Sequence, residues 1–333
     1  MTCSLIYLVK VARLTLVMFV LVGFEEEFAA EADAQAKASR AVILAVPAPS
    51  LSYLPIHVAI RRGFFSRRGL DVQVVQMSAG LAAPALLNHA IDYTTVPSGP
   101  ATAASRGAPL KVIAFASVKL QHLLVSRPET NTVNELAGKR IGAGGFGTLP
   151  AYEARTIIER YRLGPNTIIV PVNSSVDRLL ATQKGTIDAG IVSAPLDIKA
   201  EEMGLKSLLH IGSILPIPQA GLATSDEKLK STRAEVIEML KATIEGLEYT
   251  ATQRDGTVEI IGRWMNLNPA QSAKAYESVK DTFSRDGVPT DEQLKAYITM
   301  MGATAGLKAD VPAAALFDFS AANEAAKEMG LRR

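Results

Sequence analysis

The stretch Gly63-Phe64-Phe65-Ser66-Arg67-Arg68-Gly69-Leu70-Asp71-Val72 says more about the fold than any other part of this 333-residue chain. It is typical of the end of one helix, a short basic turn and the start of a strand. Gly63 and Gly69 are placed to end helical turns, because glycine adopts left-handed backbone conformations without a steric penalty. The two phenylalanines between them are expected to anchor the turn in a core, and the leucine and second hydrophobic residue after Gly69 to begin the inward face of a strand.

On both sides of this stretch, short β-branched runs alternate with helical segments. Strands are expected at 42–46, 72–76, 93–96, 111–116, 140–143, 168–172 and 189–192. Helices are expected between them at 54–62, 82–89, 149–163, 175–184 and 196–203. Such alternation favours parallel sheets with helices on their faces. Beyond Asp226 the strand signals stop, and helices are expected at 232–254, 257–265, 269–284, 290–301 and 320–329.

Two short segments have the pattern of a capping box, in which the first and fourth side chains satisfy free backbone N–H groups reciprocally. They are Thr132-Val133-Asn134-Glu135 and Thr290-Asp291-Glu292-Gln293. Each therefore predicts the start of a helix.

Residues 86–100 and residues 180–195 share a similar sequence pattern. Each segment holds an Ile-Asp pair, a valine four residues after the aspartate, and then a loop of small residues. Asp92 and Asp188 are expected to cap turns. Two halves built on one plan would each place the small-residue loop at the carboxyl end of a sheet, where open α/β sheets bind ligands.

The N-terminus has the pattern of a secretory leader. Residues 3–24 carry only two charges, Lys10 and Arg13, and residues 14–24 form an uncharged apolar run that is too short to span a bilayer. Small residues follow at Ala34-Gln35-Ala36. We expect a signal peptide over residues 1–36, cleavage near Ala36 and a periplasmic location. An uncleaved membrane anchor is the alternative.

Composition excludes several classes of function. The single cysteine, Cys3, lies in the leader, so the chain after it has no thiolate nucleophile, disulfide or cysteine-based metal site. After residue 36 there are 33 basic and 28 acidic residues, dispersed without a basic tract, so no nucleic-acid partner is expected. The four histidines are scattered, which predicts no metal site and no cofactor, although His122 lies close enough to a predicted domain crossing to be a possible ligand contact.

Residues 142–147, Gly-Ala-Gly-Gly-Phe-Gly, contain the spacing Gly-x-Gly-x-x-Gly, which by itself is a weak sign of a nucleotide site. Here the helix is expected to start after the last glycine, with Thr148 as its cap, whereas a dinucleotide site opens its helix inside the motif. No acidic residue ends the next strand. We therefore expect ordinary ligand contact at Gly147 and Thr148, through backbone N–H groups at a helix start, with a plain capped turn as the alternative.

Other predicted strand ends offer the same uncharged chemistry. Hydroxyl groups and free backbone N–H groups are expected in the loops at Ser52-Tyr53, at Ser78-Ala79-Gly80 and at Ser98-Gly99. Any one of these is most simply an N-cap. The prediction of a ligand site depends on several of them facing one cleft.

With these motifs in place, the chain resembles the solute-binding proteins of nitrate, sulfonate, taurine and thiamine-pyrimidine-precursor ABC importers. The resemblance is carried by residues 63–72, by Gly107-Ala108-Pro109-Leu110-Lys111-Val112-Ile113-Ala114 and by Leu136-Ala137-Gly138-Lys139-Arg140-Ile141-Gly142. His89 departs from the family pattern, which usually has glycine there.

The resemblance implies an α/β, two-lobed periplasmic-binding-protein fold of type II, with two parallel or mixed sheets flanked by helices. Residues 37–126 and 224–333 would form lobe I and residues 127–223 lobe II, joined by crossings near 123–128 and 219–225. Carried over position by position, the ligand contacts would be Ser52, Tyr53, Ser78, Gly80, Ser98, Gly99, Gly147, Thr148, Ser193 and Asp197.

The resemblance also implies a function without bond chemistry. We expect a monomer that captures a small-molecule ligand, such as a sulfonate, a pyrimidine or an aromatic acid, and presents it to an ABC permease and its ATPase. One alternative is an enzyme on the same fold, such as the thiamine-pyrimidine synthase, which needs a cysteine-rich segment that this chain lacks. A second alternative is an extracytoplasmic sensor-type binding protein with no transporter.

Overall fold

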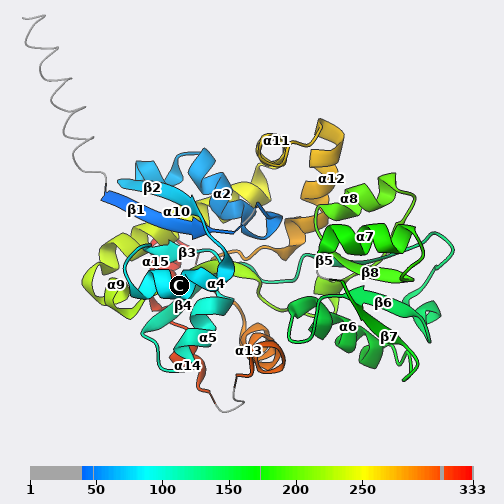
Figure 1. The fold of residues 1–333 in the computed structure, drawn as a ribbon. Helices are drawn as coiled ribbons and strands as arrows, with labels where there is room; N and C mark the ends of the chain where they lie inside the picture. Colours follow the sequence, from blue (N-terminus) through cyan, green and yellow to red (C-terminus); the bar gives the residue numbers. More distant parts are fainter. Residues whose placement is uncertain (1–39, 48, 173, 308–310, 332–333) are drawn as a thin grey trace, which may run out of the picture.

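A computed structural model describes residues 40–47, 49–172, 174–307 and 311–331, so the expected leader lies outside the described residues. Two five-stranded sheets stand side by side, each covered by helices (Figure 1). The first sheet has the order β2 (Leu70–Gln76), β1 (Arg40–Val46), β3 (Tyr93–Thr94), β10 (Ala220–Ser225), β4 (Leu110–Ser117). The second has the order β7 (Ile168–Pro171), β6 (Arg140–Ala143), β8 (Ala189–Ser193), β5 (His122–Ser126), β9 (Lys206–His210).

The two sheets follow one plan. In the first, β1 pairs in parallel with β2 and β3, and β10 runs antiparallel between β3 and β4. In the second, β6 pairs in parallel with β7 and β8, and β5 runs antiparallel between β8 and β9. The predicted α/β class with two mixed sheets is confirmed. Strand β9 was not predicted, because it is a short strand at a sheet edge and its sequence, Lys-Ser-Leu-Leu-His, does not alternate between polar and apolar residues.

Helices connect the parallel strands and form the C-terminal region, as expected. Those associated with the first sheet are α2 (Leu54–Arg61), α3 (Phe64–Arg67), α4 (Ala79–Leu87) and α5 (Ser98–Ala104). Those of the second are α6 (Leu149–Arg160), α7 (Ser175–Gln183) and α8 (Leu196–Glu202). The C-terminal helices are α9 (Asp226–Ser231), α10 (Arg233–Thr252), α11 (Arg254–Met265), α12 (Pro269–Val279), α13 (Asp291–Ala305), α14 (Ala313–Leu316) and α15 (Ser320–Glu328).

The stretch from Gly63 to Val72 folds as predicted. Gly63 and Gly69 both have left-handed backbones, with φ of 69° and 73°. Phe64 and Phe65 are buried in the core that α2, α10 and the first sheet share. The turn between them directs the chain out of α2 and into β2 beside β1.

Asp92 and Asp188 bridge strands in the same way. The backbone N–H of Ile43 on β1 donates to Asp92 Oδ2 at 2.8 Å, and the N–H of Arg140 on β6 donates to Asp188 Oδ2 at 2.9 Å. Each aspartate returns a bond through its own N–H to the carbonyl of the same partner residue. The shared sequence pattern therefore marks a side-chain bridge between neighbouring strands, and not only a capped turn.

One predicted capping box is wrong and the other is confirmed. Residues 133–136 form a single turn of 3₁₀ helix, and the Thr132 hydroxyl donates to the Glu135 carboxylate instead of accepting a backbone N–H. The turn ends at once because Gly138 has φ of 74° and leads the chain into β6. At the start of α13, Thr290 and Gln293 make both bonds of the box.

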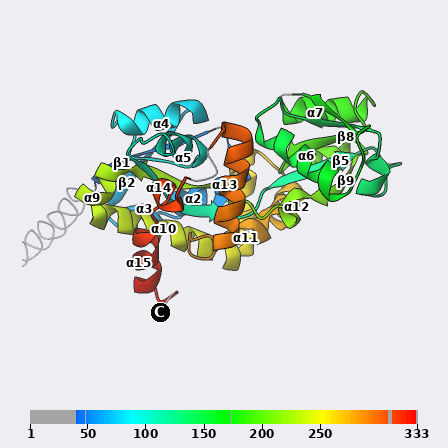
Figure 2. The same cartoon turned by 90° about the horizontal axis from the view of Figure 1, so that it is seen from below.

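Helix α13 lies between the two halves of the molecule (Figure 2). The ring of Tyr297 anchors it to the first sheet, because it packs edge-on against Phe115 of β4 at 5.2 Å and against Phe317 at 5.8 Å. The Gln293 side chain adds a hydrogen bond to the Val118 carbonyl. The other end of α13 contacts α6, so a helix fixed to the first sheet touches the second unit.

Candidate functional site

A cavity of about 540 Å³ lies where α4, α5, α13 and the loop before α6 meet. Residues from both halves line it, namely Gly80, Ser98 and Gly99 in the first turns of α4 and α5 and Gly147 in the loop before α6. Four of the ten predicted contacts thus share one cavity. Its volume falls within the range of small-molecule sites, roughly 300–1,000 Å³.

Two more predicted contacts flank this cavity as helix caps. Ser78 directly precedes α4, and Thr148 caps α6 by accepting the N–H of Ala151. Before that cap, Gly147 has φ of 80°, and a β-carbon there would come within 3.3 Å of the Thr304 carbonyl of α13. Only glycine suits this conformation, so the loop before α6 can lie close against α13.

The remaining contacts predicted in the first half lie elsewhere. Ser52 and Tyr53 are buried in a 3₁₀ turn after β1, and the Ser52 hydroxyl pairs with Ser50. Burial raises the pKa of Tyr53 to about 12. The Tyr53 ring stands edge-on to Trp264 at 5.3 Å, beside a separate hollow of about 340 Å³.

Trp264 is only partly buried. It stacks on the His57 imidazole at 4.0 Å with the rings inclined by 11°. His57 and Trp264 line two hollows. Burial, with the nearby Arg61 charge, lowers the pKa of His57 to about 4.

The contacts predicted in the second half, Ser193 and Asp197, do not line the cavity. The Ser193 hydroxyl lies 3.4 Å from that of Ser175. Asp197 begins the first turn of α8 and is only 9% exposed. Its Oδ1 has no hydrogen-bond partner among the described residues, and burial raises the pKa of its carboxyl.

His122 is part of a buried polar network that holds the second half together. Its Nδ1 lies 2.7 Å from the Glu153 carboxylate of α6, which is fully buried. Nearby, the Arg178 guanidinium donates to the Ile191 carbonyl and to the Val172 carbonyl. Burial lowers the pKa of Arg178, and the Glu153 charge partly offsets this. These bonds fix α6 and α7 against β5 and β8, and so position the loop that carries Gly147.

Several residues of the cavity were not predicted from the sequence. They are Arg106 at the end of α5, Gln219 before β10, and Tyr297, Met300, Met301 and Thr304 of α13. The α13 residues have the spacing i, i+3, i+4, i+7 of one helix face, which usually means core packing. The only sequence signal that could have indicated a ligand-binding face was the presence of a tyrosine and two methionines in this stripe.

The glycine-rich motif lacks the helix start that is typical of a dinucleotide site. Helix α6 begins at Leu149, after the final glycine, as expected. The part of the chain that the structure describes contains no group of three or more His, Cys, Asp or Glu side chains able to hold a metal ion. It also contains no helix both long and apolar enough to cross a membrane.

The molecule thus has two halves built on one plan, with a cavity lined by residues of both. The sequence model described as NMT1/THI5 like matches residues 51–256, more than half of the chain. The chain therefore belongs to the NMT1/THI5-like family, which confirms the resemblance found in the sequence. No curated protein sequence matches it.

Solved structures show the same fold at low sequence identity. The periplasmic sulfonate-binding protein SsuA from Methylobacillus flagellatus has a TM-score of 0.71 and 14% identity over 88% of this chain and 96% of that one. The periplasmic nitrate-binding protein NrtA from Synechocystis has a TM-score of 0.65 and 12% identity over 87% and 89%. The desulfurization enzyme DszB has a TM-score of 0.68 and 11% identity over 86% and 99%. Binding proteins and an enzyme thus share this architecture.

Proposed function

We propose that this chain is an exported solute-binding protein that captures a small organic solute between its lobes and delivers it to an ABC permease driven by an ATPase. The observation that carries the proposal is the shared cavity, in which Gly80, Ser98 and Gly99 of one half face Gly147 of the other. Backbone N–H groups at helix starts suit an anionic or polar group. The binding proteins among the structural neighbours support the same reading.

Lobe closure is the proposed mechanism. We take residues 37–126 with 224–333 as lobe I and residues 127–223 as lobe II, with the crossing strands β5 and β10 as the hinge. A ligand that contacts loops of both lobes binds the closed form better than the open one, and this difference in affinity shifts the equilibrium toward closure. The closed form, a monomer, is then what the permease recognises in the periplasm.

A thermal-shift screen tests the proposal. The chain from Lys37 to Arg333 is heated with sulfonates, pyrimidines, aromatic acids and amines, and a true ligand raises the melting temperature by mass action. Ser98→Trp and Thr148→Trp should each abolish that rise, because the indole fills or blocks the cavity mouth. Thr186→Trp, on an exposed loop of the second half, is the matched control and should retain it. An undiminished rise in both cavity variants would contradict the placement of the site.

An enzyme is the second candidate, because a desulfurization enzyme shares the fold. Each compound that stabilises the protein is incubated with a hundredth of its molar amount of protein, and the solution is followed by chromatography. A binding protein leaves the compound unchanged. Consumption of many equivalents would replace the transport proposal with an enzymatic one.

A further inference from the structure

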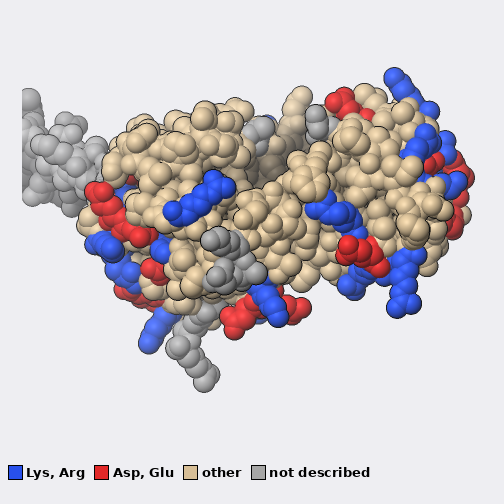
Figure 3. Space-filling view, turned by 60° about the horizontal axis from the view of Figure 1, so that its bottom comes forward, with Lys and Arg blue, Asp and Glu red and all other residues tan. Residues whose placement is uncertain are grey.

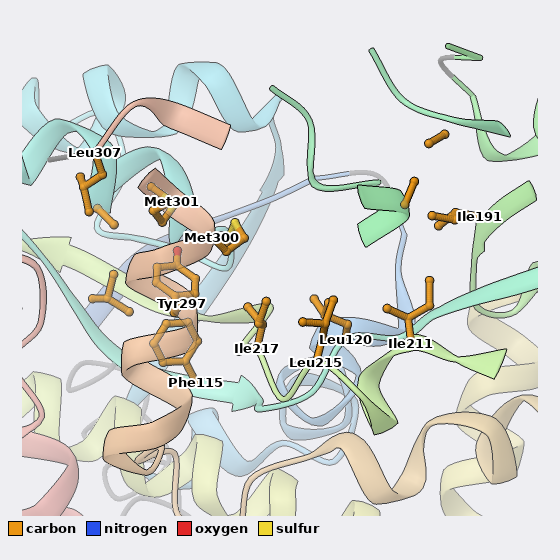
Figure 4. Close-up of a cluster of buried hydrophobic side chains, with 14 of the residues drawn as sticks. Phe115, Leu120, Ile191, Ile211, Leu215, Ile217, Tyr297, Met300, Met301 and Leu307 are labelled. Carbon is orange, nitrogen blue, oxygen red and sulfur yellow. The ribbon is translucent and has the colours of Figure 1, made fainter. Parts of the chain in front are cut away.

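Helix α13 supplies one whole wall of the cavity. Tyr297, Met300, Met301 and Thr304 follow one another along a single face of the helix and all line it. Both methionine side chains are buried, and they lie beside the hydroxyl end of the Tyr297 ring (Figure 4). Methionine is flexible and polarisable, so such a wall adapts to apolar groups of different shape.

Apart from α13, the lining combines apolar and uncharged polar side chains and carries only one kind of charge. Alanines of α4 and α5, Leu149 and Pro218 complete the apolar surface, while Arg106 is the one charged residue of the lining. No ion pair involves Arg106 within the described part of the chain, and its side chain is exposed. On the face drawn in Figure 3, acidic and basic side chains lie close together in groups, with wide uncharged areas between the groups. A cavity with a cation and no acid disfavours cationic ligands and suits an anion.

The Tyr297 hydroxyl is a second, independent sign of a ligand. Tyr297 is 1% exposed, and its hydroxyl has no hydrogen-bond partner among the described residues. Aromatic packing against Phe115 and Phe317 fixes the ring, so the hydroxyl cannot turn away to find one. Buried hydroxyls are rarely left without a partner, because that forfeits hydration without a compensating bond. A ligand atom that accepts a hydrogen bond would satisfy it once the methionines move aside.

We infer, on the basis of the proposed function, that α13 is the specificity wall of the site and that the cargo is an organic anion with a bulky hydrocarbon body. The body packs against Met300 and Met301, an acceptor atom of the ligand meets the Tyr297 hydroxyl, and Arg106 balances the negative charge. A small inorganic anion or a short-chain acid would leave most of the cavity unfilled and the methionine wall without a partner. Such ligands are therefore bound weakly or not at all.

Calorimetric titration with matched pairs of probes tests this inference. Phenylacetate, hexanoate and benzenesulfonate carry the apolar body, whereas acetate, methanesulfonate and nitrate lack it, and hexanamide lacks the charge. The large anions should bind at least tenfold more tightly than the small ones and than hexanamide. The carboxylate and sulfonate arms identify which anionic group is preferred.

Three variants assign the effect to named side chains. Met300→Ala with Met301→Ala should weaken the large anions about tenfold or more, and so reduce their advantage over the small ones. Tyr297→Phe should weaken binding about tenfold while leaving the melting temperature of the ligand-free protein equal or higher, because it removes an unpartnered hydroxyl. Arg106→Gln should reduce the preference for anions over hexanamide. Thr299→Ala, on the exposed face of α13, is the matched control and should change none of these.

The outcomes separate this inference from the function on which it rests. If small anions or cationic compounds bind as tightly as the large anions, or if the α13 variants bind like the Thr299 control, the specificity wall is refuted and the transport proposal stands. If no compound of the thermal-shift screen or of this series binds at all, the proposed function itself fails.

Discussion

At the scale of single residues, the stacked pair of His57 and Trp264 offers an optical probe of protonation. Trp264 is the only tryptophan of the chain, so its fluorescence reports on one place. Burial and the Arg61 charge lower the pKa of His57 from 6.5 to about 4. Between these two pH values the imidazole is neutral in the folded protein and protonated in the unfolded chain. Stability therefore falls as pH drops from about 6.5 toward 4.

We expect Trp264 fluorescence to be quenched on acidification with a midpoint near pH 4, because an imidazolium stacked on an indole accepts electron density from its excited state. Fluorescence titration checks this, with circular dichroism to confirm that the protein stays folded. His57→Gln removes the titrating group and should give a flat profile. A midpoint near pH 6.5 would mean that the His57 imidazole is hydrated, and would contradict the lowered pKa.

The roles of single residues could be predicted from the sequence where they depend on local backbone geometry. Gly63, Gly69 and the caps at Thr148 and Thr290 were assigned because backbone conformation and capping depend on near neighbours. The role of Tyr297 was not predictable, because its ring contacts and its unpartnered hydroxyl depend on residues nearly two hundred positions away, such as Phe115.

At the scale of elements, the packing of α10 against α2 depends on a close backbone approach. A β-carbon at Gly246 would lie 2.2 Å from the Pro55 carbonyl oxygen and 3.0 Å from the β-carbon of Ala59. Helix α10 can therefore cover α2 only with glycine at this position. The same contact places α2, and with it the turn after β1, against the first sheet.

Gly246→Ala should destabilise the protein by about 1–3 kcal/mol, as measured by chemical denaturation. In an open helix this substitution would instead stabilise by up to about 1 kcal/mol, so the sign of the change tests the contact. Gly80→Ala in α4 is the control, because no heavy atom lies within 4 Å of the β-carbon that it would add. Equal effects of the two substitutions would contradict the close approach.

Most helices and strands could be predicted, because the spacing of apolar residues and the glycines that end helices are local signals. The sequence predicted β6 with its observed bounds, and most helices to within a few residues. It left α5 as a loop with a helix start and omitted β9, because a run of small residues and a short edge strand have little periodicity of their own.

At the scale of the whole molecule, the two similar sheets and the strands that cross between them favour relative motion of two bodies. We expect small-angle scattering to show a smaller radius of gyration when a compound from the thermal-shift screen is bound at saturation, at the mass of a monomer. Thr148→Trp, which blocks the cavity, should show no contraction, and Thr186→Trp should contract like the unmodified chain. An unchanged profile with a tightly bound ligand would argue for a rigid pair of lobes.

The presence of two similar halves could be predicted from the sequence, because the segments around Asp92 and Asp188 repeat. Which of the predicted contacts line the cavity could not be predicted. Ser52, Tyr53, Ser193 and Asp197 stand at strand ends as expected, yet the structure does not bring them to the cavity shared by Gly80, Ser98, Gly99 and Gly147. Which strand ends converge depends on how the lobes pack and on where α13 inserts.

The position of α13 in the chain has one more consequence. The family model ends at residue 256, whereas the helix that walls the cavity begins at Asp291. The family model therefore leaves out the helix that we propose selects the ligand, although the match to the SsuA structure covers 88% of this chain. Exchanging residues 291–305 between relatives would therefore test directly whether this one helix can change which solute is bound.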